Sequence, residues 1–131
     1  MERWLGRYSP QCFAILRIVA GVMFVFHGLQ KLFGWPGDKA PAAFPTRSWI
    51  AGVIEVGGGS LIAIGLFAGF AAFLCSGLMA FAYFLSHAKN GFFPIMNRGE
   101  LAVVYCFLWL YVASHGAGIW SLDAVRTRRR R

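Results

Sequence analysis

An acid and two bases occur in stretches that otherwise read as membrane sequence. His27 and Lys31 lie four residues apart in GVMFVFHGLQKLFGW, and Glu55 is the only charged residue between Trp49 and Ser86. Each charge deep in lipid costs at least about 2.5 kcal/mol, so ionisable residues there are usually paired or functional. An imidazole, an amine and a carboxylate could pass protons or hydrogen-bond the polar head of a lipid-soluble molecule.

Further polar side chains occur at the ends of later apolar stretches. Tyr83 and His87 close one stretch, and Asn97 and Glu100 open the next. No residue is assigned a catalytic role, and the three isolated cysteines have no metal-ligand spacing. The candidate ligand-binding residues are therefore His27, Lys31, Glu55, Tyr83, His87, Asn97 and Glu100.

The composition is that of a membrane protein. Of 131 residues, 58% are hydrophobic and only 14% are charged, whereas soluble domains have about 25% charged residues. The net charge of +8 does not indicate nucleic-acid binding, because the basic residues lie in the termini, the loops and the ends of the apolar runs, without a nucleic-acid-binding motif. The basic tail at 124–131 reads instead as a topology signal beside a membrane segment.

Four apolar stretches predict an all-α, integral membrane four-transmembrane-helix bundle that forms a single membrane domain over 1–131. A span needs about 20 largely apolar residues, and we predict helices at about 13–33, 48–67, 69–87 and 98–115. The sequence Asn97-x-x-Glu100 fits a capping box at the start of the fourth helix. On the second helix, one face with small residues is expected to pack inward: Gly52, Glu55, Gly59 and Ile62.

Four spans place both termini on the same side of the membrane. Arginines near the two termini outnumber the basic residues of the long loops, so we predict cytoplasmic termini in a multi-pass protein. With that orientation His27 and Glu55 each lie six residues, or about 9 Å, below the outer boundary. They are therefore expected to lie within reach of each other.

The same residues also have structural interpretations. Glu55 could be held by His27 or Lys31 as an interhelical ion pair, and Glu100 could only cap its helix. Lys31 could extend to the membrane interface. Arg17, near the inner end of the first helix, is expected to reach lipid phosphates in the same way.

The order of several stretches resembles the DoxX family of small bacterial four-helix membrane proteins. The stretches are RIVAGVMFVFHGLQKLFG, WIAGVIEVGGGSLIAIGLFAGFAAF, AYFLSHAKNGFFPIMNRGELAVVYCFLWLY and GAGIWSLD. The resemblance implies a bacterial inner-membrane protein related to subunits of quinol oxidase and thiosulfate:quinone oxidoreductase systems. The resemblance covers almost all of Leu16 to Asp123. The residues that carry it are Gly21, Gly28, Lys31, Glu55, Gly58, Gly65, His87, Gly91, Asn97, Glu100, Gly116, Gly118 and Asp123.

Two hypotheses of different class follow. The chain is either a quinone-interacting subunit of a membrane oxidoreductase system or a non-catalytic accessory subunit that anchors a larger complex. Membrane lipid and either a protein partner or a second copy are expected as partners, and nucleic acid is not. No covalent cofactor is expected, because haem, iron–sulfur, dinucleotide and P-loop motifs are missing from the sequence; a bound quinone or lipid is expected instead.

Overall fold

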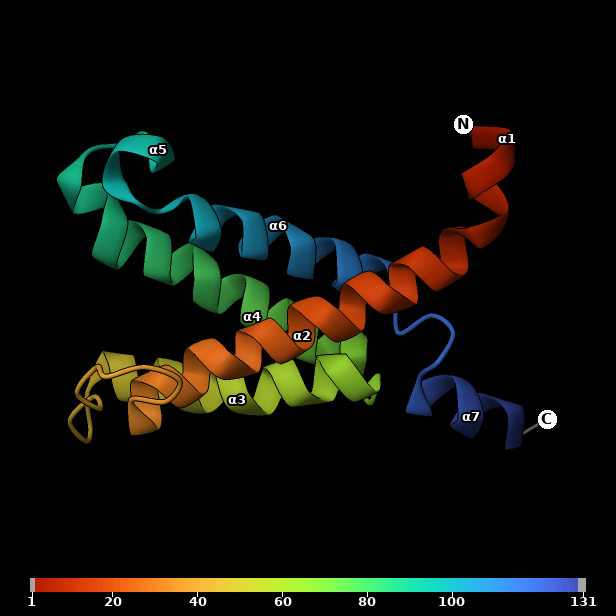
Figure 1. The fold of residues 1–131 in the computed structure, drawn as a ribbon, viewed down its shortest axis with the longest axis horizontal. Coiled ribbons are helices and arrows are strands. Elements are labelled where there is room, and N and C mark those ends of the chain that lie inside the picture. Colours follow the sequence, from red (N-terminus) through yellow and green to blue (C-terminus); the bar gives the residue numbers. More distant parts are fainter. Residues whose placement is uncertain (1, 130–131) are drawn as a thin grey trace.

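Residues 2–129, which the computed structural model describes, form helices joined by loops and short turns (Figure 1). Four long helices make the bundle: α2 (Ser9–Phe33), α3 (Arg47–Ile64), α4 (Ala68–Ala82) and α6 (Glu100–His115). Shorter helices flank them: α1 (Glu2–Leu5), α5 (Pro94–Asn97) and α7 (Leu122–Arg129). A π-helical turn (Tyr83–His87) prolongs α4, and 3-10 turns occupy Gly6–Tyr8 and Ala88–Asn90.

The helices have the length and composition of membrane spans. Three helical stretches, Gly6–Phe33, Arg47–Ile64 and Ala68–Asn90, are long and apolar enough to cross a membrane. The apolar helix α6 has 16 residues and is therefore about 24 Å long. The prediction of an all-α membrane bundle is confirmed.

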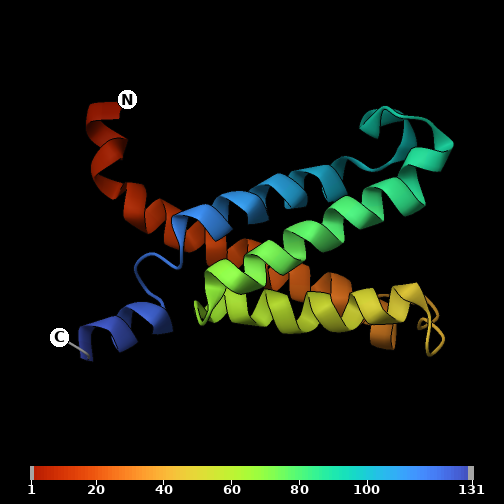
Figure 2. The same ribbon diagram turned by 180° about the vertical axis from the view of Figure 1, so that it is seen from behind.

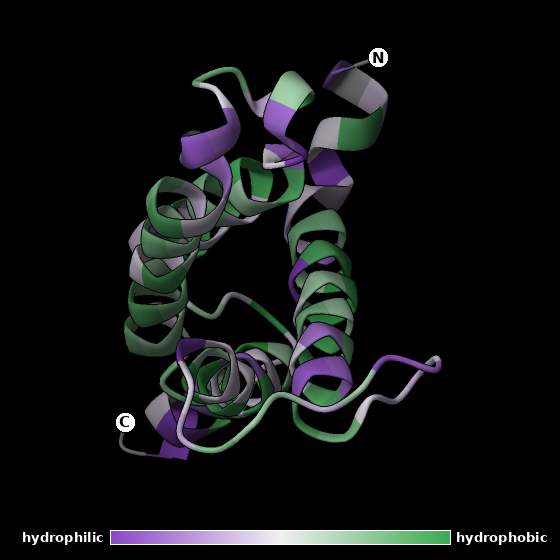
Figure 3. Cartoon of the chain, turned by 90° about the vertical axis from the view of Figure 1, so that its left-hand side faces the viewer, coloured by the Kyte–Doolittle hydropathy of each residue, from purple (hydrophilic) through white to green (hydrophobic). Residues whose placement is uncertain are grey.

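Large apolar side chains cover the outer faces of the bundle as well as its interior. In the end-on view, hydrophobic residues continue around the long helices, while hydrophilic residues gather in loops and at helix ends (Figure 3). Phe70, Phe73 and Phe107 are 69%, 62% and 66% exposed. An outer surface of this kind is stable only against lipid, so these faces lie in the membrane.

The helix ends depend on glycines that adopt left-handed backbone conformations. Gly34 (φ 74°) ends α2 and Gly65 (φ 71°) ends α3, as is common because glycine has no Cβ to clash there. Thr46 caps the start of α3 by accepting a hydrogen bond from the Trp49 amide at 3.3 Å. Relative to the expected bounds, α2 begins four residues earlier, at Ser9, and α3 ends three residues earlier, at Ile64.

The predicted capping box before the fourth helix is wrong. The N-cap of α6 is Gly99, and no side chain caps this helix. Arg98 has φ 59°, so the chain reverses there and Asn97 remains at the end of α5. The Asn97 side-chain oxygen instead accepts a hydrogen bond from the Gly99 amide at 2.8 Å.

Two antiparallel helix pairs build the bundle, α2 with α3 and α4 with α6 (Figure 2). Glycines let α2 and α3 approach closely: a Cβ added to Gly28 would lie 2.6 Å from the carbonyl oxygen of Gly52. The buried residues of α3 are Gly52, Glu55, Gly59 and Ile62, which confirms the predicted inward face. Between α2 and α6, the rings of Phe24, Tyr105 and Trp109 pack with centroids 5.1–5.5 Å apart.

Arg17 does not reach lipid phosphates, so that prediction is wrong. Its side chain is fully buried, and its guanidinium donates to the carbonyl oxygens of Ile62 (2.5 Å), Ala63 (2.7 Å) and Trp120 (2.8 Å). The last carbonyls of a helix have no partner within the helix and carry partial negative charge, so a cation is stabilised there. Arg17 thus joins α2, the end of α3 and the loop before α7.

Both described ends of the chain lie at the same end of the bundle (Figures 1 and 2). The segment 124–131, expected to be a basic tail, is helical as far as Arg129 within α7, and 130–131 lie outside the described residues. Ser121 caps α7 by accepting a hydrogen bond from the Ala124 amide at 3.2 Å. The loops that follow α2 and α4 both lie at the opposite end (Figure 1).

Candidate functional site: a polar pocket between the helices

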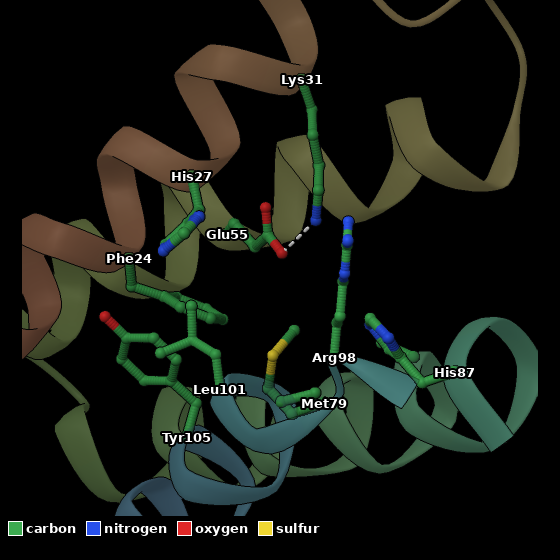
Figure 4. Close-up of a pocket in the computed structure, with 11 residues that line it drawn as sticks. Phe24, His27, Lys31, Glu55, Met79, His87, Arg98, Leu101 and Tyr105 are labelled. Carbon is green, nitrogen blue, oxygen red and sulfur yellow. Dashed lines mark hydrogen bonds and ion pairs between the residues drawn. The ribbon is translucent and has the colours of Figure 1, made fainter. Parts of the chain in front are cut away.

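A cavity of about 190 Å³, here called the polar pocket, opens between the helices toward the loop end of the bundle (Figure 4). It takes residues from α2, α3, α4, the π-helical turn and α6, so its lining is assembled from all four long helices. The lining residues are Phe24, His27, Lys31, Glu55, Met79, Ala82, His87, Arg98, Leu101, Ala102 and Tyr105.

Helix spacing and close helix packing place the first polar groups. Phe24, His27 and Lys31 are three and four residues apart and therefore share one face of α2. Gly28 lies between them in sequence and packs against α3 at Gly52, where α3 begins the face that carries Glu55. The small residues thus bring the His27–Lys31 turn of α2 beside the carboxylate of α3.

Glu55 is the buried charge of the pocket, and Lys31 is its partner. The Lys31 ammonium donates to Glu55 Oε1 in a hydrogen-bonded ion pair, with 33% of the Lys31 side chain exposed and only 2% of the Glu55 side chain. The second oxygen, Oε2, is buried and has no hydrogen-bond partner among the described residues. A buried acceptor of this kind costs free energy until a donor reaches it.

His27 lines the pocket, but Glu55 forms its ion pair with Lys31 and not with His27. Its ring is half-buried and lies edge-on to the Tyr105 ring, with centroids 6.0 Å apart. In Figure 4 the imidazole, the carboxylate of Glu55 and the ammonium of Lys31 all lie along the α2–α3 side of the pocket. A ligand in the pocket could therefore meet a proton carrier and a carboxylate together.

The π-helical turn places His87 at the far wall of the pocket. Such turns insert an extra residue into a helix and often occur at functional sites. His87 is half-buried, and its Nδ1 lies 3.1 Å from the carbonyl oxygen of Asn97. That contact fixes the ring from the side of α5.

Tyr83 and Asn97 are buried, but they order the α4–α6 connection instead of lining the pocket. The Tyr83 hydroxyl donates to the carbonyl oxygen of Phe92 and accepts from the Asn97 amide nitrogen at 3.4 Å. The same nitrogen donates to the carbonyl oxygen of Gly91 at 2.7 Å. These two candidates therefore support the wall that carries His87.

Glu100 lies on the outside of this wall, and Arg98 takes the place that had been expected for it. Glu100 is exposed and lines a separate surface hollow with Ile95 and Val104. Arg98 lines both that hollow and the polar pocket, and in Figure 4 its side chain extends toward Lys31 and Glu55. Arg98 is itself exposed and reaches the pocket from its edge, a placement that no sequence pattern indicated.

The polar pocket carries an excess of positive charge. Lys31 and Arg98 are cations that face the single carboxylate of Glu55, and two imidazoles stand beside them. Tyr105, which sequence reasoning also missed, adds an aromatic wall on α6. The arrangement can bind a flat, apolar ring with polar oxygens, where the cations favour oxygens that gain negative charge.

Metal chemistry has no ligand set in the part of the chain that the structure describes. Among residues 2–129, no group of three or more histidine, cysteine, aspartate or glutamate residues is placed to hold a metal ion.

The sequence is similar to that of known proteins over most of its length. A family model described as DoxX matches residues 12–88. The chain belongs to the DoxX family. This DoxX-family protein is 44% identical over 126 residues to an uncharacterized protein of Haemophilus influenzae, with 91% of this chain and 93% of that protein covered. No solved structure matches it.

The family match covers seven of the eleven residues that line the polar pocket. Residues 12–88 include His27, Lys31, Glu55 and His87, whereas Arg98 and the α6 residues follow the matched region. The resemblance to the DoxX family inferred from the sequence is confirmed, and the apolar helices place the protein in a lipid environment.

Proposed function

We propose that this DoxX-family membrane protein is a quinone-binding subunit of a membrane oxidoreductase system, with the quinone head in the polar pocket. The observation that supports this most is Glu55, whose Oε2 is buried without a partner in the described chain while Oε1 pairs with Lys31. A quinol hydroxyl could donate to Oε2, and a quinone carbonyl could accept from Lys31 or Arg98. A lipid headgroup could accept hydrogen bonds from the same two cations. The proposal therefore has to be tested by direct binding of a quinone-type ring.

The size of the polar pocket fits a head group better than a whole amphiphile. Its volume of about 190 Å³ is below the roughly 300–1,000 Å³ of drug-sized sites but above the 150 Å³ cavity that holds a single benzene. The ring would lie between Phe24, Met79 and Tyr105, and the tail would leave between helices. The surface hollow that shares Arg98 and Leu101 with the pocket offers such an exit.

Each polar residue has a role in this proposal. Reduction of a quinone to a quinol takes two electrons and two protons, and a redox centre on a partner protein would supply the electrons. His27 and Glu55 would pass the protons, because each can hold one and both border the pocket. Lys31 and Arg98 would stabilise negative charge on the oxygens, and His87 would bind the second carbonyl.

The proposal includes a location. The protein would be a multi-pass protein of the bacterial inner membrane with cytoplasmic termini, which puts the polar pocket in the outer half of the membrane. A partner protein or a second copy would pack against the lipid-facing surface.

Quinone retention tests the proposal. The full-length protein is purified in a mild detergent, titrated with the reduced, quinol form of a short-chain ubiquinone analogue, and its bound quinol is measured by mass spectrometry. Glu55→Gln should weaken binding about 10- to 100-fold, the equivalent of one charge-assisted hydrogen bond. Glu100→Gln, an exposed glutamate outside the pocket, should bind as the wild type does; equal binding by all three proteins would contradict the proposal.

The alternative is an accessory subunit that anchors a larger complex, and the Lys31–Glu55 pair itself favours it. The pair joins α2 to α3, so it could serve only to hold the bundle together. Lys31→Met with Glu55→Gln removes both charges at once and should keep the fold. A folded double variant that assembles with its partner and supports full activity of the complex would favour the accessory role.

A further inference from the structure

A second hollow lies at the opposite end of the molecule from the polar pocket. This C-terminal groove has a volume of about 430 Å³ and lies between the end of the α6–α7 loop and α7. Its size falls within the roughly 300–1,000 Å³ of ordinary ligand sites. It is lined by Ile119, Trp120, Ser121, Ala124, Val125 and Arg128.

Specific hydrogen bonds hold the groove in place beside the bundle. The buried Arg17 donates to the carbonyl oxygen of Trp120 at 2.8 Å. Asp123 bonds twice to the α3–α4 turn: its amide donates to the Gly65 carbonyl at 2.9 Å, and its carboxylate accepts from the Ala68 amide at 3.2 Å. The start of α7 is therefore fixed at the level where α3 ends, which is the boundary of the apolar bundle.

The exposed side of α7 combines basic and apolar side chains. Arg128 lines the groove, and Arg126 and Arg129 are exposed on the same helix, with Arg126 lying 5.0 Å from the centre of the Phe67 ring. Asp123, the acidic residue of this helix, is occupied by the α3–α4 turn. Trp120 and Val125 remain 60% and 50% exposed. An apolar groove with a cationic rim at the membrane boundary matches a lipid whose head is anionic.

We infer that the C-terminal groove binds an anionic phospholipid, with an acyl chain along Trp120 and Val125 and the phosphate at Arg128, the arginine of α7 that lines the groove. Arg126 and Arg129 add positive charge nearby on the same helix. The positive rim distinguishes an anionic from a zwitterionic head, and the apolar lining distinguishes a lipid from a soluble phosphate. Each arginine near a membrane surface contributes about fivefold to such binding at moderate salt. The lipid would fix α7 against the membrane.

Lipid titration of the purified full-length protein tests this inference. Delipidated protein in detergent is titrated separately with phosphatidylglycerol and phosphatidylcholine, and bound lipid is counted by native mass spectrometry. The wild type should prefer phosphatidylglycerol. Arg126→Gln/Arg128→Gln/Arg129→Gln should reduce that preference by about fivefold per arginine and leave phosphatidylcholine binding unchanged.

Two matched controls separate a site from general charge attraction. Lys39→Gln/Arg47→Gln/Lys89→Gln removes the same charge from the loop end and should leave the preference intact. Val125→Asp places a carboxylate in the groove and should weaken phosphatidylglycerol binding, whereas Ala40→Asp in a distant loop should not. Equal affinity of the wild type for both lipids, or equal losses in the two triple variants, would overturn the inference. All the arginines and lysines changed are exposed, so each variant is expected to fold, and circular dichroism checks this.

Discussion

Glu55 is a buried carboxylate with a single charged partner in the described chain. It is 1% exposed, one of its oxygens is paired with Lys31, and the other has no partner in the described part of the chain. A buried charge is tolerated when it is paired, and removal of one partner costs more than removal of both. The buried carboxylate of Glu55 therefore depends on Lys31 for its compensating charge.

Lys31→Met should destabilise the protein because it leaves the Glu55 carboxylate buried without its cation. We expect a loss toward the lower end of about 3–5 kcal/mol, because 33% of the Lys31 side chain is exposed. Adding Glu55→Gln to the same protein should recover much of that loss. Thermal unfolding in detergent, followed by circular dichroism, measures both; a double variant less stable than Lys31→Met alone would contradict this account.

Close packing of helix α2 against helix α3 positions the residues of the polar pocket. At Gly28 an added Cβ would meet the carbonyl oxygen of Gly52 at 2.6 Å and the amide nitrogen of Val56 at 2.8 Å. These are backbone atoms of α3, so the clash can be relieved only by moving one helix away from the other. Any such movement would separate Lys31 from Glu55.

Gly28→Ala should therefore destabilise the bundle by about 1–3 kcal/mol, as overpacking of a tight contact usually does. Gly57→Ala is the matched control: Gly57 lies in α3 and has nothing within 4 Å of an added Cβ. That control should be neutral or up to about 1 kcal/mol more stable, because alanine favours helix. Melting temperatures of the two variants in one detergent decide the matter, and equal effects would count against close packing at Gly28.

Basic side chains distinguish one end of the described molecule. The N-terminal segment and α7 lie at one end (Figure 1), and exposed basic residues there include Arg7, Arg126 and Arg128. Arginine-rich ends of membrane proteins usually remain in the cytoplasm. The polar pocket, at the other end of the bundle, would then face the outer half of the membrane.

Reporter fusions test this orientation. A green fluorescent protein joined to the C-terminus should fluoresce, and alkaline phosphatase at the same position should be inactive, because the tail is expected in the cytoplasm. Alkaline phosphatase inserted in the loop at 37–43 should be active. The reverse pattern would place the polar pocket in the inner half of the membrane and would change which compartment supplies its protons.

Local sequence patterns were sufficient for the helices and for one inward face. Apolar stretches of spanning length predicted the bundle, since lipid requires each span to satisfy its own backbone hydrogen bonds. The spacing of Gly52, Glu55 and Gly59 predicted which side of α3 is buried, because a helix repeats every 3.6 residues. The start of the fourth helix was harder to predict from the sequence, because a left-handed turn at Arg98 prevents the capping pattern at Asn97 from forming.

The sequence by itself determined a four-helix membrane protein with ionisable residues near one end of its spans. Tertiary structure alone decided the partners of those residues: Lys31, not His27, pairs with Glu55, and Arg98, not Glu100, enters the polar pocket. It also decided that Arg17 binds carbonyl groups of α3 and the α7 loop instead of lipid phosphates. The physical reason is that helix periodicity fixes which face a side chain occupies, whereas its partner depends on how distant segments pack.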